Sequence, residues 1–429
     1  MIVALLLLLV PLSQSPRDGG CTEWHDCRQL ALAAADRGEY ETFHDLAWRA
    51  VQTGPPNDPS LMYLLARAQS LSGRPHDALV MLQRLADLGV ASDADTNDDF
   101  KRTRQLPGWP EVAARMHRIA HPDSPRAAEP AAAASSPSSA PTPEAARFST
   151  EGFVPGGLAY DAVSRRLLFV DRLGRKLIVV GEGSNHPVDF VRADSAGFQE
   201  ISAVEIDARR GDLWVASAAD SGGTLHKLQL VSGRPLKAFP VDADLEPVKL
   251  VDLAVTPSGA VLVLDSANRR LLALRAGGTS LERVVRMNVR EPASLATTSD
   301  DDIVYVAHRE GVSRIDLRAR TAKPVAAPKS VSLAHLERIR WRRHALIAVQ
   351  ADDDGSRRIV RLDLNANGSA VTRETTVEGA LPTTGPTFVT ISGDELLYLV
   401  DGSGHATGQS PRDAPASIVE FVAYRVHLR

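Results

Sequence analysis

Six polar residues recur at one position of a repeated pattern, and they are the first candidates for chemistry in this chain. Each follows a short apolar run, such as VLVL before Asp265, that reads as a buried strand. The six are Asp171, Ser217, Asp265, His308, Gln350 and Asp401. Three aspartates and a histidine could serve in acid–base catalysis, but an aspartate that ends a strand also accepts backbone N–H groups of the following turn. Because a structural role repeats in every copy, we expect these residues to cap turns.

Three charged residues beside the first strands of the pattern are better candidates for ligand binding. They are Asp252, Glu337 and Arg338, and we expect them to face a central channel, where contact with channel water is the alternative role. No residue at metal-ligand or nucleophile spacing accompanies His308 or His335. The chain contains no Gly-x-Ser-x-Gly, phosphate loop or His-Glu-x-x-His motif. The sequence therefore predicts no catalytic residue, no metal site and no cofactor.

The elements that position these residues belong to a unit repeated six times between Phe148 and Arg429. The clearest copy, Leu253 to Leu274, reads LAVTPSGAVLVLDSANRRLLAL, with turn residues between short strands that alternate or are wholly apolar. Four-stranded units of about 45 residues are typical of a propeller, so we predict an all-β six-bladed β-propeller over residues 147–429. The sixth copy has no fourth strand, and we expect Arg147 to Thr150 to supply it and close the ring.

Two families resemble this pattern. The central copy resembles the NHL repeat in Leu253-Ala254-Val255, in Pro257-Ser258-Gly259 and in the run from Val263 to Arg270. The first copy, GGLAYDAVSRRLLFVDR, is similar to the first blade of the SMP-30/gluconolactonase family. Both resemblances imply a six-bladed ring with any site at one mouth of the channel.

The lactonase resemblance can be tested at the metal-binding glutamate that this family carries at the start of its first blade. Gly156 occupies that place here, and glycine has no side chain to bind a cation. The matching places in the other copies are Ser202, Val251, Ala293, Glu337 and Pro386. One carboxylate in six places disfavours a metal-dependent hydrolase.

Residues 21–120 have helical periodicity instead. Two predicted helix pairs resemble tetratricopeptide repeats, since Gly38 and Gly73 lie 35 residues apart and small and large packing residues follow the family pattern in the second pair. The resemblance implies protein binding, and a plain helix cluster is the alternative. Cys21 and Cys27 are the only cysteines, and we predict that they form a disulfide at the start of the first helix.

The remaining segments suggest export and a linker. Residues 1–15 contain the apolar run IVALLLLLVPL, which is too short for a stable membrane anchor and fits a cleaved signal peptide. Residues 121–146 are rich in Ala, Pro and Ser and are expected to form a linker. We therefore expect a periplasmic or extracellular protein.

Composition limits the function only broadly. The chain has 429 residues and a formal net charge of -4, without the basic surface expected of a nucleic-acid-binding protein. We predict an exported, non-enzymatic binding or scaffolding protein that contacts a protein partner through its helical repeats and a propeller face. The alternative is an SMP-30/lactonase-like metal-dependent hydrolase or lyase with its site at the channel mouth.

Overall fold

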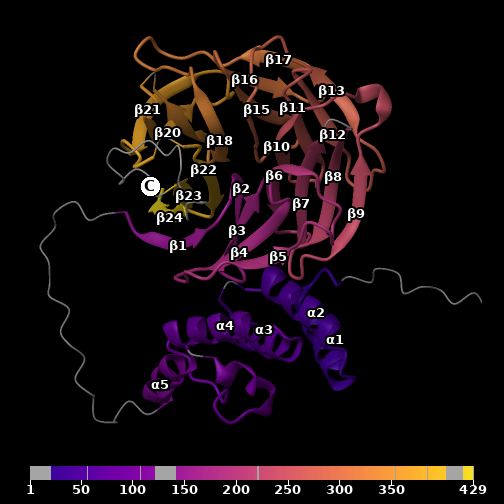
Figure 1. Ribbon diagram of the computed structural model, residues 1–429, viewed down its shortest axis with the longest axis vertical. Coiled ribbons are helices and arrows are strands. Elements are labelled where there is room, and N and C mark those ends of the chain that lie inside the picture. Colours follow the sequence, from indigo (N-terminus) through magenta and orange to yellow (C-terminus); the bar gives the residue numbers. More distant parts are fainter. Residues whose placement is uncertain are drawn as a thin grey trace, which may run out of the picture. The chain divides into compact units, whose positions relative to one another are not determined.

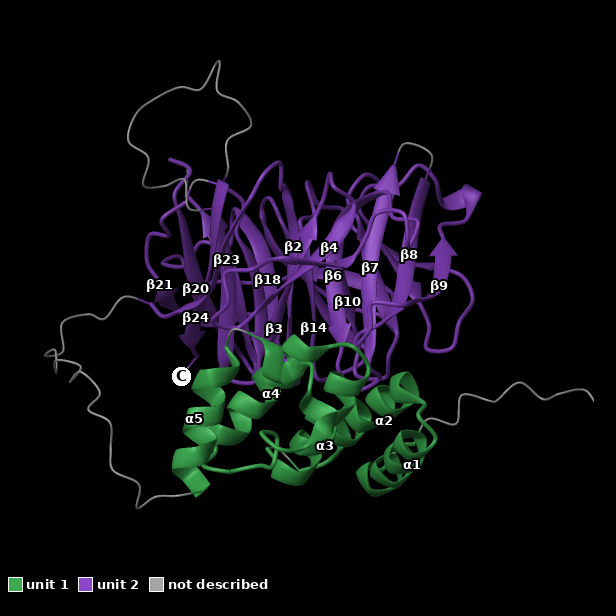
Figure 2. Cartoon of the chain, turned by 60° about the horizontal axis from the view of Figure 1, so that its bottom comes forward, with its two compact units in different colours: residues 1–126 green, residues 127–429 purple. Residues whose placement is uncertain are grey.

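The computed structural model describes residues 21–120, apart from 56 and 107, and residues 142–428, apart from 220, 221, 353, 384 and 402–418. The chain divides into two compact units, residues 1–126 and 127–429 (Figure 2). The predicted signal peptide, residues 1–15, lies outside the described residues, as do residues 121–141 of the predicted linker. No helix within the described ranges is long and apolar enough to cross a bilayer.

The first unit is a small helical domain. Its helices are α1 (Trp24–Asp36), α2 (Tyr40–Thr53), α3 (Pro59–Leu71), α4 (Pro75–Asp87) and α5 (Trp109–Ala120), with short 3-10 turns at η1 (Asp98–Phe100) and η2 (Thr103–Gln105). Gly38 and Gly73 adopt positive φ values of 71° and 83° in the two pair-forming turns, which glycine tolerates best. A disulfide joins Cys21 to Cys27, and Cys27 is buried against Ala50 and Leu61. A small helical domain is confirmed, whereas its tetratricopeptide character stays a prediction.

The second unit is a six-bladed β-propeller, as predicted (Figure 1). Every blade is a four-stranded antiparallel sheet. Blade 1 contains β2 (Pro155–Asp161), β3 (Arg166–Asp171), β4 (Lys176–Gly181) and β5 (Val188–Val191). Blade 2 contains β6 (Glu200–Asp207), β7 (Asp212–Ala219), β8 (Gly222–Gln229) and β9 (Pro235–Pro240). Blade 3 contains β10 (Leu250–Val255), β11 (Val261–Asp265), β12 (Arg270–Leu274) and β13 (Glu282–Arg286).

The other three blades repeat this order with one exception. Blade 4 contains β14 (Ser294–Thr297), β15 (Ile303–His308), β16 (Gly311–Asp316) and β17 (Thr321–Pro324). Blade 5 contains β18 (Leu336–Arg342), β19 (Ala345–Ala351), β20 (Arg357–Leu364) and β21 (Val371–Glu378). Blade 6 contains β22 (Phe388–Ser392), β23 (Glu395–Asp401) and β24 (Val419–His427), and its outer strand is β1 (Glu144–Thr150). The predicted ring closure is thus confirmed, although the first three residues of β1 lie inside the predicted linker.

Apolar side chains between neighbouring blades form the core of the propeller. The second strands are almost wholly buried, because each has a blade on both faces. One cluster joins blades 6 and 1 around Phe148, whose ring contacts Phe153, Phe169 and Phe421. Packing of this kind fixes the first strands around the channel and so positions the residues at its mouth.

Candidate functional site

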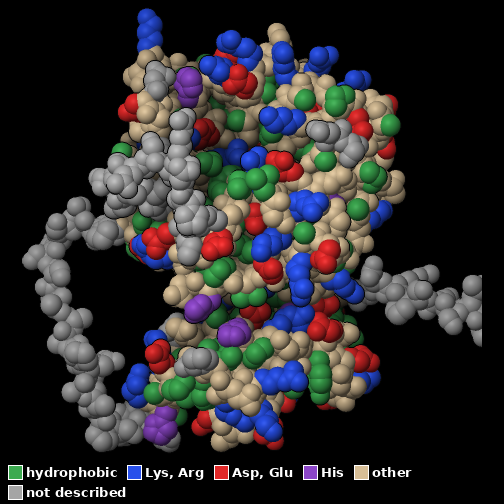
Figure 3. Space-filling view, in the orientation of Figure 1, with side chains coloured by type: hydrophobic (Ala, Val, Ile, Leu, Met, Phe, Trp, Pro, Cys, Tyr) green, Lys and Arg blue, Asp and Glu red, His purple; other side chains and the backbone are tan. Residues whose placement is uncertain are grey.

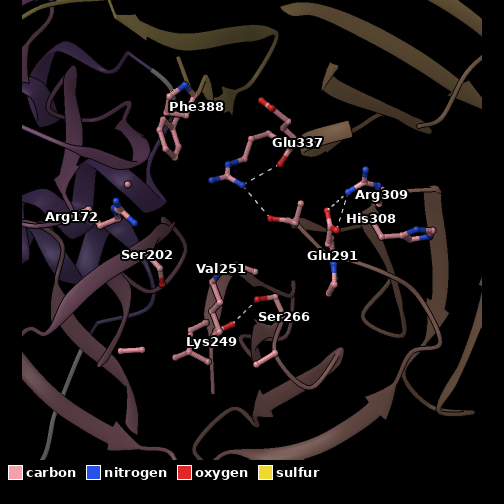
Figure 4. A pocket seen from close by; sticks show the side chains of 18 of the residues that line it. Arg172, Ser202, Lys249, Val251, Ser266, Glu291, His308, Arg309, Glu337 and Phe388 are labelled. Atoms are coloured by element: carbon pink, nitrogen blue, oxygen red, sulfur yellow. Dashed lines mark hydrogen bonds and ion pairs between the residues drawn. The ribbon is translucent and has the colours of Figure 1, made fainter. Parts of the chain in front are cut away.

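One mouth of the propeller opens into a cavity of about 1510 Å³, lined by the entrances to the first strands (Figure 4). The six positions matched above to the lactonase glutamate all line it. In blades 1, 2, 3 and 5 the register between first and second strands shifts at this position. Such a β-bulge turns one residue out of the ladder, so Ser202, Val251 and Glu337 point to the mouth.

The three candidate ligand-binding residues lie along this same opening but have different surroundings. Glu337 lines the mouth and forms an ion pair with Arg357 at 2.8 Å. Arg338 lines both the mouth and the narrow channel below it. Asp252 lies deeper and is buried, and it accepts hydrogen bonds from Ser294 Oγ at 2.6 Å and Leu295 N at 3.0 Å. Glu337 and Arg338 are therefore accessible from the mouth, whereas Asp252 joins two first strands.

Sequence reasoning missed two charged residues that complete a network in the channel. Arg340 donates to Asp252 Oδ2 at 3.4 Å, and Glu205 lies within electrostatic reach of both groups. Burial raises the pKa of Glu205 to about 7, while Arg340 opposes the rise and Asp252 adds to it. Burial alone would lower the pKa of Arg340, but the carboxylates of Asp252 and Glu205 raise it. Both residues could have been recognised in the sequence. Each occupies the centre of a first-strand core, where the other copies have alanine or valine.

Two of the three aspartates that close second strands, Asp171 and Asp265, cap the following turn as predicted, while the turn after Asp401 lies outside the described residues. Asp265 Oδ1 accepts from Ala267 N at 3.2 Å in the following turn and from Lys249 N at 3.0 Å in the loop that enters the blade. Asp171 Oδ1 likewise accepts from Gly174 N at 3.0 Å. Their oxygens are engaged by backbone N–H groups, so these two aspartates secure loops.

His308 differs from the other residues that end the second strands. The expectation that no partner accompanies it is wrong. Its Nδ1 lies 3.0 Å from Glu310 Oε2, and its Nε2 lies 3.1 Å from Ser313 Oγ. The two-residue turn between β15 and β16 brings Glu310 back to the imidazole of His308. The hairpin places Ser313 on the neighbouring strand, diagonally across from His308. The resulting order of carboxylate, imidazole and hydroxyl is that of a serine-hydrolase triad.

The protonation states of this group suit proton transfer. Arg290 is the main cause that lowers the pKa of Glu310 to about 2, so that carboxylate is charged at neutral pH. Burial lowers the pKa of His308, although Glu310 acts in the opposite direction. The imidazole lines the mouth cavity and is 7% exposed, while Ser313 is 4% exposed. A neutral imidazole held between a charged carboxylate and a hydroxyl can accept the hydroxyl proton.

Blade 2 contains a related pair without the carboxylate. Ser217 Oγ lies 2.9 Å from His226 Nε2, and both residues are buried. Burial lowers the pKa of His226 to about 4. This pair shares the Ser–His contact but no described carboxylate bonds to its imidazole, so it offers an internal comparison for blade 4.

The mouth does not fit the metal site that the lactonase resemblance implies. A Cβ at Gly156 would lie 2.8 Å from Val170 Cγ1 and 2.9 Å from the carbonyl oxygen of Ile201, so packing there admits no larger residue without a shift. Throughout the described ranges, no three His, Cys, Asp or Glu residues are grouped so that they could hold a metal ion. No reaction step is therefore drawn through a metal.

Comparison with known proteins finds similar propellers among solved structures alone. No family model matches the chain, and no curated protein matches it. Among solved structures, a luciferin-regenerating enzyme is 16% identical with a TM-score of 0.46, covering 65% of this chain and 92% of its own. An aldose sugar dehydrogenase from Streptomyces coelicolor is 11% identical with a TM-score of 0.44, covering 66% and 99%. The calcium-binding protein regucalcin from Agrobacterium tumefaciens is 16% identical with a TM-score of 0.43, covering 65% and 93%.

These similarities correct the functional prediction. The chain was predicted to be a non-enzymatic binding or scaffolding protein, and this prediction is contradicted, since the propellers found by this comparison are mostly enzymes. At such low identity the likeness concerns the fold, and no activity of those proteins transfers to this chain.

Proposed function

We propose that the propeller is a hydrolase for carboxylic esters or lactones, and that Glu310, His308 and Ser313 carry the reaction. The observation that supports this is their hydrogen-bonded order, with distances of 3.0 Å and 3.1 Å, in which His308 lines the mouth cavity. The proposal keeps the hydrolase alternative from the sequence but replaces its metal with side chains.

The proposed mechanism follows from the contacts of each group. Ser313 Oγ attacks the acyl carbon and its proton passes to His308 Nε2, while Glu310 stabilises the imidazolium at Nδ1. The imidazolium then protonates the leaving oxygen, and a water molecule hydrolyses the acyl-serine by the same route. Because Ser313 is only 4% exposed, the turn between β15 and β16 has to open for the substrate to reach Oγ.

A serine-directed fluorophosphonate tests this nucleophile directly. We expect it to phosphonylate Ser313, with release of fluoride, and mass spectrometry of the digested protein locates the label. Hydrolysis of p-nitrophenyl acetate should fall at least 100-fold in Ser313→Ala and in His308→Ala.

The Ser217–His226 pair provides the matched control. Ser217→Ala removes an equally buried serine that bonds to histidine, and it should leave both the labelling and the esterase activity unchanged. An unlabelled Ser313, or full esterase activity in a folded Ser313→Ala variant, would overturn the proposal.

A further inference from the structure

The charge of the mouth is opposite in sign to that of the chain. Six cationic side chains line the cavity, namely Arg172, Lys249, Arg269, Arg290, Arg309 and Arg338. Three carboxylates line it, namely Glu200, Glu291 and Glu337, so the lining has a formal charge of +3 while the whole chain has -4. Figure 3 shows the propeller face hollowed at its centre, with Lys and Arg side chains at the hollow. A concave site of one sign concentrates ligands of the other sign.

The carboxylates of the mouth are already neutralised. Glu200 pairs with Arg172 at 2.9 Å, and Glu291 pairs with Arg309 at 2.9 Å. Glu337 pairs with Arg357, which does not line the cavity. Arg290 in turn pairs with Glu310, which does not line the cavity. None of these carboxylates is left to balance the other three cations.

Lys249, Arg269 and Arg338 are therefore the lining cations outside these ion pairs, with Asp252 and Glu337 acting on Arg338 electrostatically. No carboxylate of the described ranges forms an ion pair with any of them, and Lys249 and Arg269 are exposed. Arg338 is held in place, because it donates to the carbonyl oxygens of Ala293 and Glu337 at 3.1 Å and its guanidinium lies 5.0 Å from the ring centroid of Phe388. Lys249 lies across the opening from Glu337, the neighbour of Arg338 (Figure 4).

We propose that the mouth binds a small organic molecule through an oxyanion group, a carboxylate or a phosphate, which Lys249, Arg269 and Arg338 receive. This inference rests on the proposed function, because it names the class of substrate for the same site. Arginine and lysine donors on an oxyanion form charge-assisted hydrogen bonds, and a partly enclosed mouth weakens the competition from water.

Binding is measured without turnover, so that it does not depend on catalysis. The full chain is titrated calorimetrically at low ionic strength with citrate, glycerol 3-phosphate and neutral glycerol as probes. We expect at least one of the anions to bind and glycerol not to bind. Affinity should fall at least tenfold in the double variant Lys249→Gln/Arg269→Gln and also in 0.5 M salt. Binding of citrate alone assigns a carboxylate, and binding of glycerol 3-phosphate alone assigns a phosphate.

Blade 3 also supplies the control. Arg283 and Arg286 lie exposed on its outer strand β13, so Arg283→Gln/Arg286→Gln makes the same change in net charge away from the mouth. This variant should bind the anion as the wild type does. Equal weakening in both double variants, equal binding of glycerol, or no binding of either anion would overturn the inference.

The two proposals fail in different ways. If Ser313 is unreactive but anions bind through Lys249 and Arg269, the nucleophile is wrong and the ligand class stands. If Ser313 is labelled and esters are hydrolysed but anions do not bind, the hydrolase stands and the ligand class is wrong.

Discussion

Glu205 shows how one residue at a repeated position can make the stability of the propeller depend on pH. Alanine or valine fills the same place in four blades, whereas blades 2 and 5 carry Glu205 and Arg340. Burial raises the pKa of Glu205 to about 7 from an ordinary value of 4.5. Between these values the folded protein holds a proton that the unfolded chain releases. The free energy of unfolding therefore falls, through this group, as pH rises from about 4.5 to 7.

We expect Glu205→Gln to remove this part of the pH dependence, because an amide does not titrate. Relative to wild type, the variant should gain stability between pH 5 and pH 8, by up to about 3 kcal/mol. Urea denaturation at both pH values measures the difference. Parallel stability profiles for the two proteins would show that burial of Glu205 does not govern its titration.

At the scale of elements, the strand that closes the ring comes from the other end of the propeller sequence. β1 pairs with β24 in the register Phe148 to Phe421, and Phe148 is 1% exposed within an aromatic cluster. Closure removes the open edges that blades 1 and 6 would otherwise present. Stability of the whole ring should therefore depend on this one side chain.

Phe148→Ala is expected to lower the free energy of unfolding by about 3–5 kcal/mol, because it leaves a cavity among Phe153, Phe169 and Phe421. Urea unfolding followed by tryptophan fluorescence measures the loss. Ser149→Ala, on the exposed face of the same strand, should change stability little. A similar small effect for both variants would mean that the closing strand is not anchored by its aromatic packing.

At the scale of the whole molecule, six similar blades surround a mouth whose lining side chains differ from blade to blade. Equivalent bulges place glycine, serine, valine and glutamate at one mouth, so the blades present different side chains there. The described residues contain no grouped ligand set for a metal. The proposed mechanism uses Glu310, His308 and Ser313 and no metal ion.

Removal of metal tests this conclusion on the intact protein. We expect elemental analysis of the purified chain to find no stoichiometric divalent ion, and EDTA to leave both the melting temperature and the esterase activity unchanged. A bound ion together with a lower melting temperature after chelation would contradict hydrolysis by side chains and return the metal-dependent alternative.

Local information was sufficient to predict most of the fold. Strand alternation and turn residues are properties of neighbouring positions, so six copies could be recognised one after another and the missing fourth strand could be assigned to Arg147–Thr150. Asp252, Glu337 and Arg338 were likewise placed near the channel, because they flank first strands. The proposed triad could have been noticed in the sequence, since Glu310 and Ser313 lie within five residues of His308.

Only the tertiary structure decided which of these groups meet. Arg340 and Asp252 lie 88 residues apart and come together because three-dimensional closure brings first strands from different blades around one axis. Ion pairing across loops likewise decides that Glu200 and Glu291 are neutralised while Lys249 and Arg269 are not. The sequence by itself determined the blades and their order, since strand formation is local. The charge of the mouth depends on distances between blades, which no local pattern specifies.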